Sequence, residues 1–373
     1  MTMNRDNYKR LGDYIRLVDV RNRDLTVTNL LGVSISKTFI PSIANTIGTD
    51  MSTYKIVEPY QFAYGPVTSR NGDKITFALY KGKEKCIVSS AYITFETKNK
   101  EILDPDYLMM WALRPEFDRY ARFMSNGSAR EMFSWDEMCE VYLPIPDIET
   151  QRRMVSEYHA VASRLENVES LVSLLERTAQ TLFKEHFSAV SVDQLPSGWW
   201  LGSLRDVAEC YDYMRRPVSG DVRLGMNKIY PYYGAAALMD YVDNYIYDGE
   251  YVLMGEDGSV QNEDGTPVLQ FVRGKIWVNN HAHVLQGKGG FDNNLLYLKL
   301  SSTVITDIVT GGVQAKINQE NMFSIPVIIP DDHTLATMRA QVAPLFDYIF
   351  QLKDEASLLL STKETLLSKL TKE

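Results

Sequence analysis

An internal repeat constrains this chain of 373 residues more than any other feature of its sequence. The segment 141–182 can be laid over the segment 325–366 with one constant offset of 184 residues. Ile145-Pro146-Asp147 then matches Ile329-Pro330-Asp331. A repeat of this length indicates one structural unit that is built twice, so we predict the order globule, helix, globule, helix.

Both copies of the repeat carry a heptad pattern of apolar residues. Such a pattern predicts one long helix in each copy, and two matched stripes indicate that the helices pack together. A single stripe would equally suit an ordinary helix that faces a core. The first predicted seam consists of Met154, Tyr158, Val161, Leu165, Val168, Val172, Leu175 and Leu182. The second consists of Met338, Val342, Leu345, Ile349, Leu352, Leu359 and Leu366.

The sequence also predicts how these helices begin and where one is interrupted. Asp147 and Thr150 in the first copy, and Asp331 and Thr334 in the second, follow a proline and are candidate N-cap residues. Pro344 lies inside the second stripe. It should kink or break that helix, because proline lacks an N–H donor and clashes with the preceding turn.

The remaining segments, residues 1–143 and 191–329, are predicted to be mixed globules rich in strands. β-branched and aromatic runs separated by turn signals carry this prediction. In the first globule they predict antiparallel strands at 54–57, 75–80, 86–88 and 92–95 and a helix at 105–124. In the second they predict strands at 251–254, 270–272 and 276–278 and a helix at 293–301.

The charge and cysteine content exclude several classes of protein. The chain has 39 Lys+Arg against 48 Asp+Glu, a net charge of −9, which argues against binding nucleic acid or membrane by bulk charge alone. The N-terminus has no apolar leader and the aliphatic runs are too short to span a bilayer, so a soluble cytoplasmic protein is expected. The three cysteines lack a CxxC pair, which indicates neither a disulfide framework nor a structural zinc site.

Basic residues nevertheless gather at predicted turns, among amide, hydroxyl and aromatic side chains that suit base edges and phosphates. The candidate DNA contacts in the first globule are Lys37, Tyr64, Arg70, Asn71 and Lys81. Those in the second are Arg215, Arg216, Tyr232, Tyr233, Arg273 and Lys316. Two alternatives stay open, since loop cations are commonly only solvated and the tyrosines would equally serve as core residues.

No catalytic constellation is found in the sequence. It has no GxxxxGK phosphate loop, no Asn/Asp-Pro-Pro-aromatic motif for adenine methylation, and no glycine-rich fingerprint for a nucleotide or S-adenosylmethionine. His281-Ala282-His283 would place two imidazoles on one face of a strand, but no third metal ligand is placed nearby, so no metal site is predicted. The chain is expected to be non-catalytic.

This arrangement resembles the DNA-specificity subunit of type I restriction–modification systems, and the likeness covers essentially the whole chain. It rests on the order and duplication of short motifs. These are Leu11-Gly12-Asp13 and Leu201-Gly202-Ser203, matched at an offset of 190; Gly127-Ser128 and Gly311-Gly312-Val313-Gln314; Ile145-Pro146-Asp147 with Glu149-Thr150-Gln151; and Tyr230-Pro231-Tyr232-Tyr233-Gly234 before Asp248-Gly249-Glu250-Tyr251. The second copy departs from the first in lacking the Glu-x-Gln of Glu149 and Gln151.

The resemblance implies an α+β fold with two target recognition domains, residues 1–143 and 191–329, each reading one half of a split DNA sequence. The segments 144–190 and 330–373 would form an antiparallel coiled coil between them, with an internal pseudo-twofold repeat. These helices would dock two methyltransferase subunits, which bind S-adenosylmethionine and methylate adenine, and restriction (motor) subunits would join this core. A helix over residues 149–187, about 60 Å long, would act as a ruler that leaves a nonspecific spacer between the half-sites.

Two other classes of function stay open. A coiled-coil assembly scaffold would use the same helices and bind protein partners through its globules, and protection of a defined duplex sequence would distinguish a DNA-reading subunit from it. A self-contained enzyme is opposed by the missing nucleotide and S-adenosylmethionine motifs.

Overall fold

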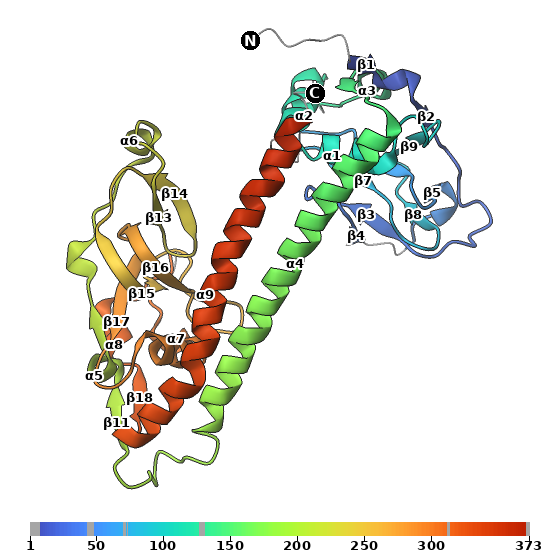
Figure 1. The fold of residues 1–373 in the computed structure, drawn as a ribbon. Coiled ribbons are helices and arrows are strands. Elements are labelled where there is room, and N and C mark those ends of the chain that lie inside the picture. The colour runs from blue at the N-terminus through green and yellow to red at the C-terminus, as the bar shows by residue number, and fades with distance from the viewer. Residues whose placement is uncertain are drawn as a thin grey trace. The chain divides into compact units, whose positions relative to one another are not determined.

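The structure is a computed structural model that describes residues 8–42, 48–69, 72, 74–126, 131–311 and 314–370. The chain divides into two compact units, Met1–Asn167 with Ala356–Glu373 and Val168–Glu355. Each unit therefore combines one globule with a part of both long helices (Figure 1). In the described part of the chain, no helix is long and apolar enough to cross a membrane.

The two helices predicted from the heptads are present and begin with the same cap. They are α4 (Ile148–Glu185) and α9 (Asp332–Lys369). The carboxylate of Asp147 accepts hydrogen bonds from N and Oγ1 of Thr150, both at 2.9 Å. Asp331 accepts the same two bonds from Thr334, at 2.9 and 3.1 Å. Asp147 and Asp331 are thus confirmed as N-caps, and each satisfies a backbone N–H group that the first helical turn leaves free. The prediction is wrong for Thr150 and Thr334, which lie inside the first turn and donate to the caps.

The predicted break at Pro344 is wrong, because α9 continues through this residue as one helix. Pro344 lies on the exposed side of the helix, where water can serve the carbonyl that loses its partner. The predicted seams are in place. Every residue named for them is buried or half-buried.

Within each unit the two helices run antiparallel. In the second unit, Lys353 Nζ lies 3.0 Å from Glu176 Oε1, and His186 Nε2 lies 2.8 Å from Gln341 Oε1. As the residue number rises along α4, the number of the contacting residue in α9 therefore falls. In the first unit, the ammonium group of Lys363 lies 5.8 Å from the ring centroid of Tyr158.

The globule of the first unit is built on an antiparallel four-stranded sheet with the order β2-β9-β6-β7, beside smaller two-stranded pairs (Figure 1). Its strands are β1 (Tyr8–Arg10), β2 (Ile15–Leu17), β3 (Leu31–Val33), β4 (Phe39–Pro41), β5 (Lys55–Val57), β6 (Phe62–Tyr64), β7 (Phe77–Leu79), β8 (Cys86–Val88), β9 (Ile93–Thr97) and β10 (Tyr142–Pro144). The predicted antiparallel strands are confirmed near their expected positions. Aromatic rings fill this core, and those of Phe62 and Phe95 stack with centroids 4.8 Å apart.

The helix predicted over 105–124 is in fact two helices. The helices of this globule are η1 (Leu11–Asp13), η2 (Met51–Thr53), α1 (Pro105–Ala112), α2 (Pro115–Met124) and α3 (Trp135–Cys139). Pro115 opens α2 and disfavours helical backbone at Arg114, which has an extended conformation. The chain therefore turns between α1 and α2.

The globule of the second unit contains a six-stranded sheet with the order β12-β17-β15-β16-β13-β14 (Figure 1). The strands of this unit are β11 (Trp200–Ser203), β12 (Ala208–Cys210), β13 (Tyr230–Tyr233), β14 (Leu238–Val242), β15 (Tyr247–Gly255), β16 (Leu269–Val278), β17 (Ala282–Gly287) and β18 (Pro326–Ile329). The two strands predicted at 270–272 and 276–278 are one strand, β16. Its pairing with β15 continues through the polar segment around Gly274, which holds the chain extended there.

Helices cover this sheet with a core that mixes aliphatic side chains with the rings of Phe271, Phe346 and Phe350. The helices are α5 (Leu204–Val207), η3 (Asp212–Met214), α6 (Gly220–Leu224), α7 (Asn293–Ser301), η4 (Thr306–Ile308) and α8 (Gln319–Phe323). The prediction of a helix at 293–301 is confirmed by α7. Leucines of α7, such as Leu296, share one buried cluster with α9 residues such as Met338 and Val342. Each globule is therefore anchored on the long helices of its own unit.

A short strand pair closes each globule and fixes the register of the repeat. Arg10 of β1 lies opposite Tyr142 of β10, and Ser203 of β11 lies opposite Pro326 of β18. Tyr142 and Pro326 are related by the offset of 184, so Arg10 and Ser203 are equivalent. The offset at the start of each globule is therefore 193 residues.

This register corrects the match drawn from the sequence at an offset of 190. Leu11-Gly12-Asp13 is equivalent to Leu204-Arg205-Asp206, not to Leu201-Gly202-Ser203. The backbone confirms the new register, because N of Leu11 donates to O of Val141 and N of Leu204 donates to O of Ile325, both at 2.8 Å. A glycine that the two half-repeats happened to share misled the sequence comparison.

The side chains at the corrected positions explain the difference between the copies. A Cβ atom at Gly12 would lie 2.7 Å from Cβ of Cys139, so only glycine fits there. The equivalent Arg205 has room, and its guanidinium lies 4.7 Å from the ring centroid of Phe323. Phe323 and Cys139 are themselves 184 residues apart, so the same contact is made by different pairs.

Candidate nucleic-acid interface

Two of the predicted DNA contacts in the first globule are buried, which corrects the prediction for them. Lys37 is 7% exposed, and its Nζ lies 2.9 Å from Asp118 Oδ1. Burial lowers the pKa of this ammonium group, and the carboxylate opposes that effect. Tyr64 is fully buried among the rings of Phe77 and Phe95. Neither side chain can reach a nucleic acid in this structure, and for Tyr64 the alternative of a core tyrosine is the right one.

The other predicted contacts of the first globule have different outcomes. Lys81 is exposed, but its Nζ donates to Asp106 Oδ2 at 2.5 Å and lies 4.9 Å from the ring centroid of Tyr60. The DNA contact of Lys81 stays a prediction, although its charge is already neutralised by Asp106. Arg70 and Asn71 lie outside the described residues.

The second globule also holds some predicted contacts in its interior. Tyr232 is 1% exposed, and its hydroxyl accepts a hydrogen bond from N of Val218 at 3.1 Å. The guanidinium of Arg215 is nearly buried, and its NH1 donates to Glu256 Oε2 at 2.5 Å. Tyr233 is half-buried. The prediction is therefore wrong for Tyr232 and Arg215, which hold the globule together.

Three predicted contacts of the second globule are on its surface. Arg273 is exposed, with its Nε 3.0 Å from Glu250 Oε1. Lys316 is exposed, with its Nζ 3.5 Å from a carboxylate oxygen of Glu256. Arg216 is exposed, and within the described ranges no carboxylate pairs with it. These three stay predictions, and Arg216 alone among them has an unneutralised charge.

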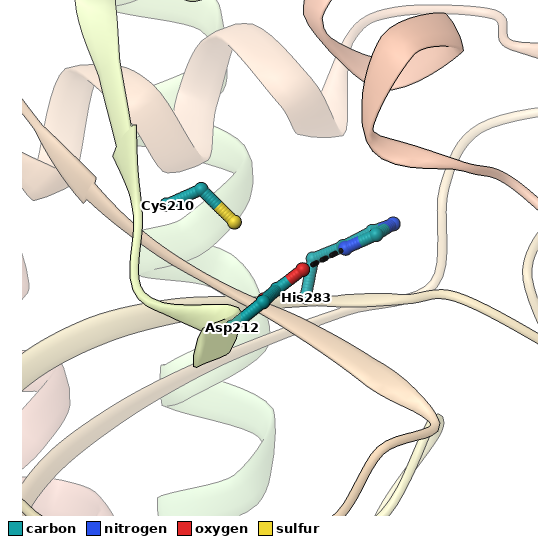
Figure 2. A group of neighbouring side chains, drawn as sticks. All are labelled: Cys210, Asp212 and His283. Atoms are coloured by element: carbon teal, nitrogen blue, oxygen red, sulfur yellow. Dashed lines mark hydrogen bonds and ion pairs between the residues drawn. The ribbon is translucent and has the colours of Figure 1, made fainter. Parts of the chain in front are cut away.

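Asp212, just after β12, is the centre of a buried polar network. Its Oδ1 accepts a hydrogen bond from N of Val284 at 2.8 Å. Its Oδ2 accepts one from Gln319 Nε2 at 2.7 Å and lies 2.6 Å from His283 Nδ1, as Figure 2 shows for the histidine. Arg215 NH2 lies 3.3 Å from the same oxygen. This carboxylate joins β12, β17 and α8.

The network holds Asp212 in its charged form. Burial by itself would raise the pKa of this carboxyl group, but the hydrogen bonds and positive charge of His283, with Arg215, lower it to about 2. His283 is fully buried, and its Nε2 lies 2.9 Å from O of Ile317. Each nitrogen of its ring therefore has an oxygen atom within hydrogen-bond distance.

Cys210, Asp212 and His283 also bring possible metal ligands within 4.8 Å of one another (Figure 2). The groups do not fit a bound cation. Nδ1 of His283 is directed at the aspartate, whose Oδ2 already faces three donors. Burial raises the pKa of the Cys210 thiol to about 12. His281 precedes β17 and pairs with Asp257 instead, so the two histidines have separate partners.

The segments that follow β2 and β12 were not singled out by sequence reasoning as a pair. We call residues 18–25 the first loop and residues 211–218 the second loop. Each presents exposed side chains on a backbone that the globule holds in place: Val20 and Arg23 in the first, Tyr213 and Arg216 in the second. The signal that would have found them is the offset of 193, which aligns the two loops.

Comparison with known proteins supports the same architecture. The sequence pattern of the Type I restriction modification DNA specificity domain matches residues 9–176 and 196–339. A type I restriction enzyme specificity subunit of Haemophilus influenzae is 34% identical over 152 residues, which is 41% of this chain and 37% of that protein. The chain thus spans little more than a third of that relative's length.

The chain was also matched to solved structures, one of which shares the fold. The S subunit of a type I restriction–modification system from M. genitalium matches with a TM-score of 0.61 at 13% identity, covering 99% of this chain and 98% of that one. The HsdS subunit from Thermoanaerobacter tengcongensis matches at 15% identity with a TM-score of 0.40, covering 100% of this chain and 99% of that one. The first likeness shows that the α+β fold with two long helices is that of an S subunit.

The family pattern falls on both copies of the structural repeat, and together its two matches cover well over half of the chain. This chain belongs to the type I restriction modification DNA specificity domain family.

Proposed function

We propose that this protein is the DNA-binding specificity subunit of a type I restriction–modification complex, and that each globule reads one half of a bipartite target. The observation that carries this proposal is the duplicated frame. The helix caps of Asp147 and Asp331, and the strand pairs β1–β10 and β11–β18, are the same construction made twice. Two copies of one reading unit in a single chain suit two half-sites, as a dimer suits a palindrome.

The proposed division of labour assigns no catalysis to this chain. Methyltransferase subunits, two per chain, would bind S-adenosylmethionine and dock on the exposed faces of α4 and α9, and restriction subunits would join that assembly. The helices would fix the length of a nonspecific spacer between the half-sites. The net charge of −9 suits such a division, because partners that close around the DNA would supply much of the phosphate neutralisation.

The test exchanges one globule in the assembled complex. Residues 1–143 are replaced by the corresponding globule of a relative, the chimera is co-expressed with its methyltransferase subunits, and methylated adenines are mapped in genomic DNA. We expect one half of the methylated sequence to change and the other half to stay the same. The matched experiment exchanges residues 191–329 and should change the other half. A change in both halves of the methylated sequence, or in neither, would contradict modular reading. A chain that binds protein partners but directs no methylation would favour a scaffold.

A further inference from the structure

The two loops are equivalent positions of the repeat. In the first globule, N of Val18 donates to O of Thr94 at 2.9 Å, directly after β2. In the second, N of Tyr211 donates to O of Val284 at 2.8 Å, directly after β12. Val18 and Tyr211 are 193 residues apart, the offset that the closing strand pairs establish.

Beyond this hydrogen bond the loop backbones differ, because Arg21 forms a β-bridge with Lys55 whereas Asp212–Met214 form η3. The offset of 193 nevertheless aligns an arginine in each loop. At the same offset Asp19 matches Asp212, the first residue beyond the paired position in each loop. Four residues further on, Arg23 matches Arg216. Both arginines are exposed.

The first loop is held by a buried amide. Asn22 is 1% exposed, and its Nδ2 donates to O of Val27 at 2.9 Å while its backbone N donates to O of Tyr54 at 3.0 Å. N of Val27 donates back to Asn22 Oδ1 at 3.2 Å. This side chain fixes the backbone beside Arg23, whose own side chain points to solvent.

The second loop is held by other groups. The Asp212 network fixes its start, as described above. At its far end, Trp277 Nε1 donates to O of Arg216 at 2.6 Å, and N of Val218 donates to the hydroxyl of Tyr232. The backbone on both sides of the Arg216 side chain is therefore anchored.

The charge of these two arginines is available for a partner. Their neighbours are not: Arg21 pairs with Asp19, and Arg215 with Glu256. No carboxylate among the residues that the structure describes pairs with Arg23 or Arg216. A cation without a partner can bind a phosphate or a base edge without first breaking an ion pair, and an anchored backbone lowers the ordering cost of binding.

We infer that Arg23 and Arg216 are equivalent DNA contacts, one in each half-site. The inference rests on the proposed function and names the residues that perform it. The forked guanidinium group suits both phosphate oxygens and the O6 and N7 atoms of guanine in the major groove. Tyr213, 78% exposed on the second loop, offers a further aromatic contact beside Arg216.

The test uses the full chain assembled with its methyltransferase subunits. Arg23→Ala and Arg216→Ala are compared with Lys288→Ala, which removes one positive charge from an exposed turn outside both loops. DNA affinity is measured against salt concentration, and methylated sites are mapped. We expect each arginine variant to lower affinity for the target about tenfold or more, and Lys288→Ala to leave it near the wild-type value.

The kind of contact follows from the pattern of loss. If the arginine contacts a base, its loss relaxes the sequence preference in one half-site only. That half-site is the one read by the first globule for Arg23→Ala and the one read by the second for Arg216→Ala. A phosphate contact weakens all sequences alike and lowers the salt dependence by about one counterion. Arg216→Lys then separates them further, since it keeps the charge but not the fork.

Two results separate failure of this inference from failure of the proposed function. If the wild-type complex methylates a bipartite site, and both arginine variants keep its affinity and sequence as Lys288→Ala does, the inference is wrong and the function stands. If the wild-type complex selects no bipartite site, the proposed function itself fails. Because both arginines are exposed, circular dichroism of each variant should match that of the wild type.

Discussion

Asp19 and Asp212 occupy one position of the repeat, yet their surroundings are opposite. The Asp19 side chain is 56% exposed and pairs with Arg21 on the surface. The Asp212 side chain is 4% exposed and meets His283, Gln319 and a backbone N–H inside the globule. The two copies thus start a loop at the same position of the repeat and hold it differently, one through a buried amide and the other through a buried carboxylate.

The comparison shows which part of a duplicated unit has to stay the same. The strand register and the first backbone hydrogen bond after the strand place the start of both loops, and these are equal in the two copies, whereas the loop backbones then differ. The side chains beneath a loop only need to satisfy its buried polar groups, and different chemistry can do that. Two globules that read different sequences can therefore diverge inside while they keep one frame.

The largest expected difference is in the loss of stability when each aspartate is replaced by alanine in a separate variant. Asp212→Ala takes the acceptor from Nδ1 of the buried His283, from Gln319 Nε2 and from N of Val284, while Arg215 keeps Glu256. Breaking a buried ion pair in this way costs about 3–5 kcal/mol. Asp19→Ala removes a surface pair with Arg21 and a longer contact, 3.7 Å, with Lys55 Nζ, and should cost less than Asp212→Ala, about 1 kcal/mol. Denaturant unfolding of both variants measures the two values. Equal losses in the free energy of unfolding would mean that the two aspartates do not have different structural roles.

The helix starts offer a second comparison. Gln151 follows the first cap and is fully buried, with its Oε1 accepting from N of Asp104 and its Nε2 donating to O of Ile102 and of Pro146. The equivalent residue of the second copy is Leu335, 2% exposed in an apolar cluster. The Glu-x-Gln that the second copy lacks thus has a structural role in the first.

Exchanging these residues should harm both units. Gln151→Leu takes the side-chain partner from three backbone groups at part-buried hydrogen bonds, and Leu335→Gln buries an amide among apolar side chains. Each change should cost about 1–3 kcal/mol per unsatisfied group, measured as the loss in free energy of unfolding. Gln151→Glu serves as a control of nearly the same shape, and it should fail as well, because it cannot donate to both carbonyls. A stable Gln151→Leu variant would show that the amide is dispensable.

Much of the fold could be predicted from the sequence, for physical reasons that favour the helices. The heptads of α4 and α9 are long, and the caps at Asp147 and Asp331 are local. The register of the repeat at the start of each globule was harder to predict. Leu11 pairs across more than a hundred residues with Val141, and only the strand pair shows that Leu204 is its equivalent.

The candidate site could be predicted far less well. Tyr64 and Tyr232 are aromatic residues near turns, and nothing local tells an exposed ring from a core ring. Arg215 and Arg216 are neighbours in sequence, yet one is inside an ion network and the other is free in solvent. Tertiary contacts decide these outcomes, so composition at a turn indicates an interface but not which residues form it.

The smallest effect expected from the comparison is a difference in how stability depends on pH. The pKa of Asp212 is lowered to about 2 in the folded protein from an ordinary value of 3.8. A lowered pKa contributes stability that is present above the unfolded value and is lost as pH falls through the folded value. Between pH 5 and pH 3 the wild type should therefore lose about 1 kcal/mol through this group. Asp212→Asn removes the titration, so its deficit against the wild type should shrink by that amount over the same interval. Hydrogen exchange of the amides of the second loop measures the change locally, and Asp19→Asn gives the matched control in the first globule. If the deficit of Asp212→Asn is the same at both pH values, the carboxylate does not carry the charge that the network implies.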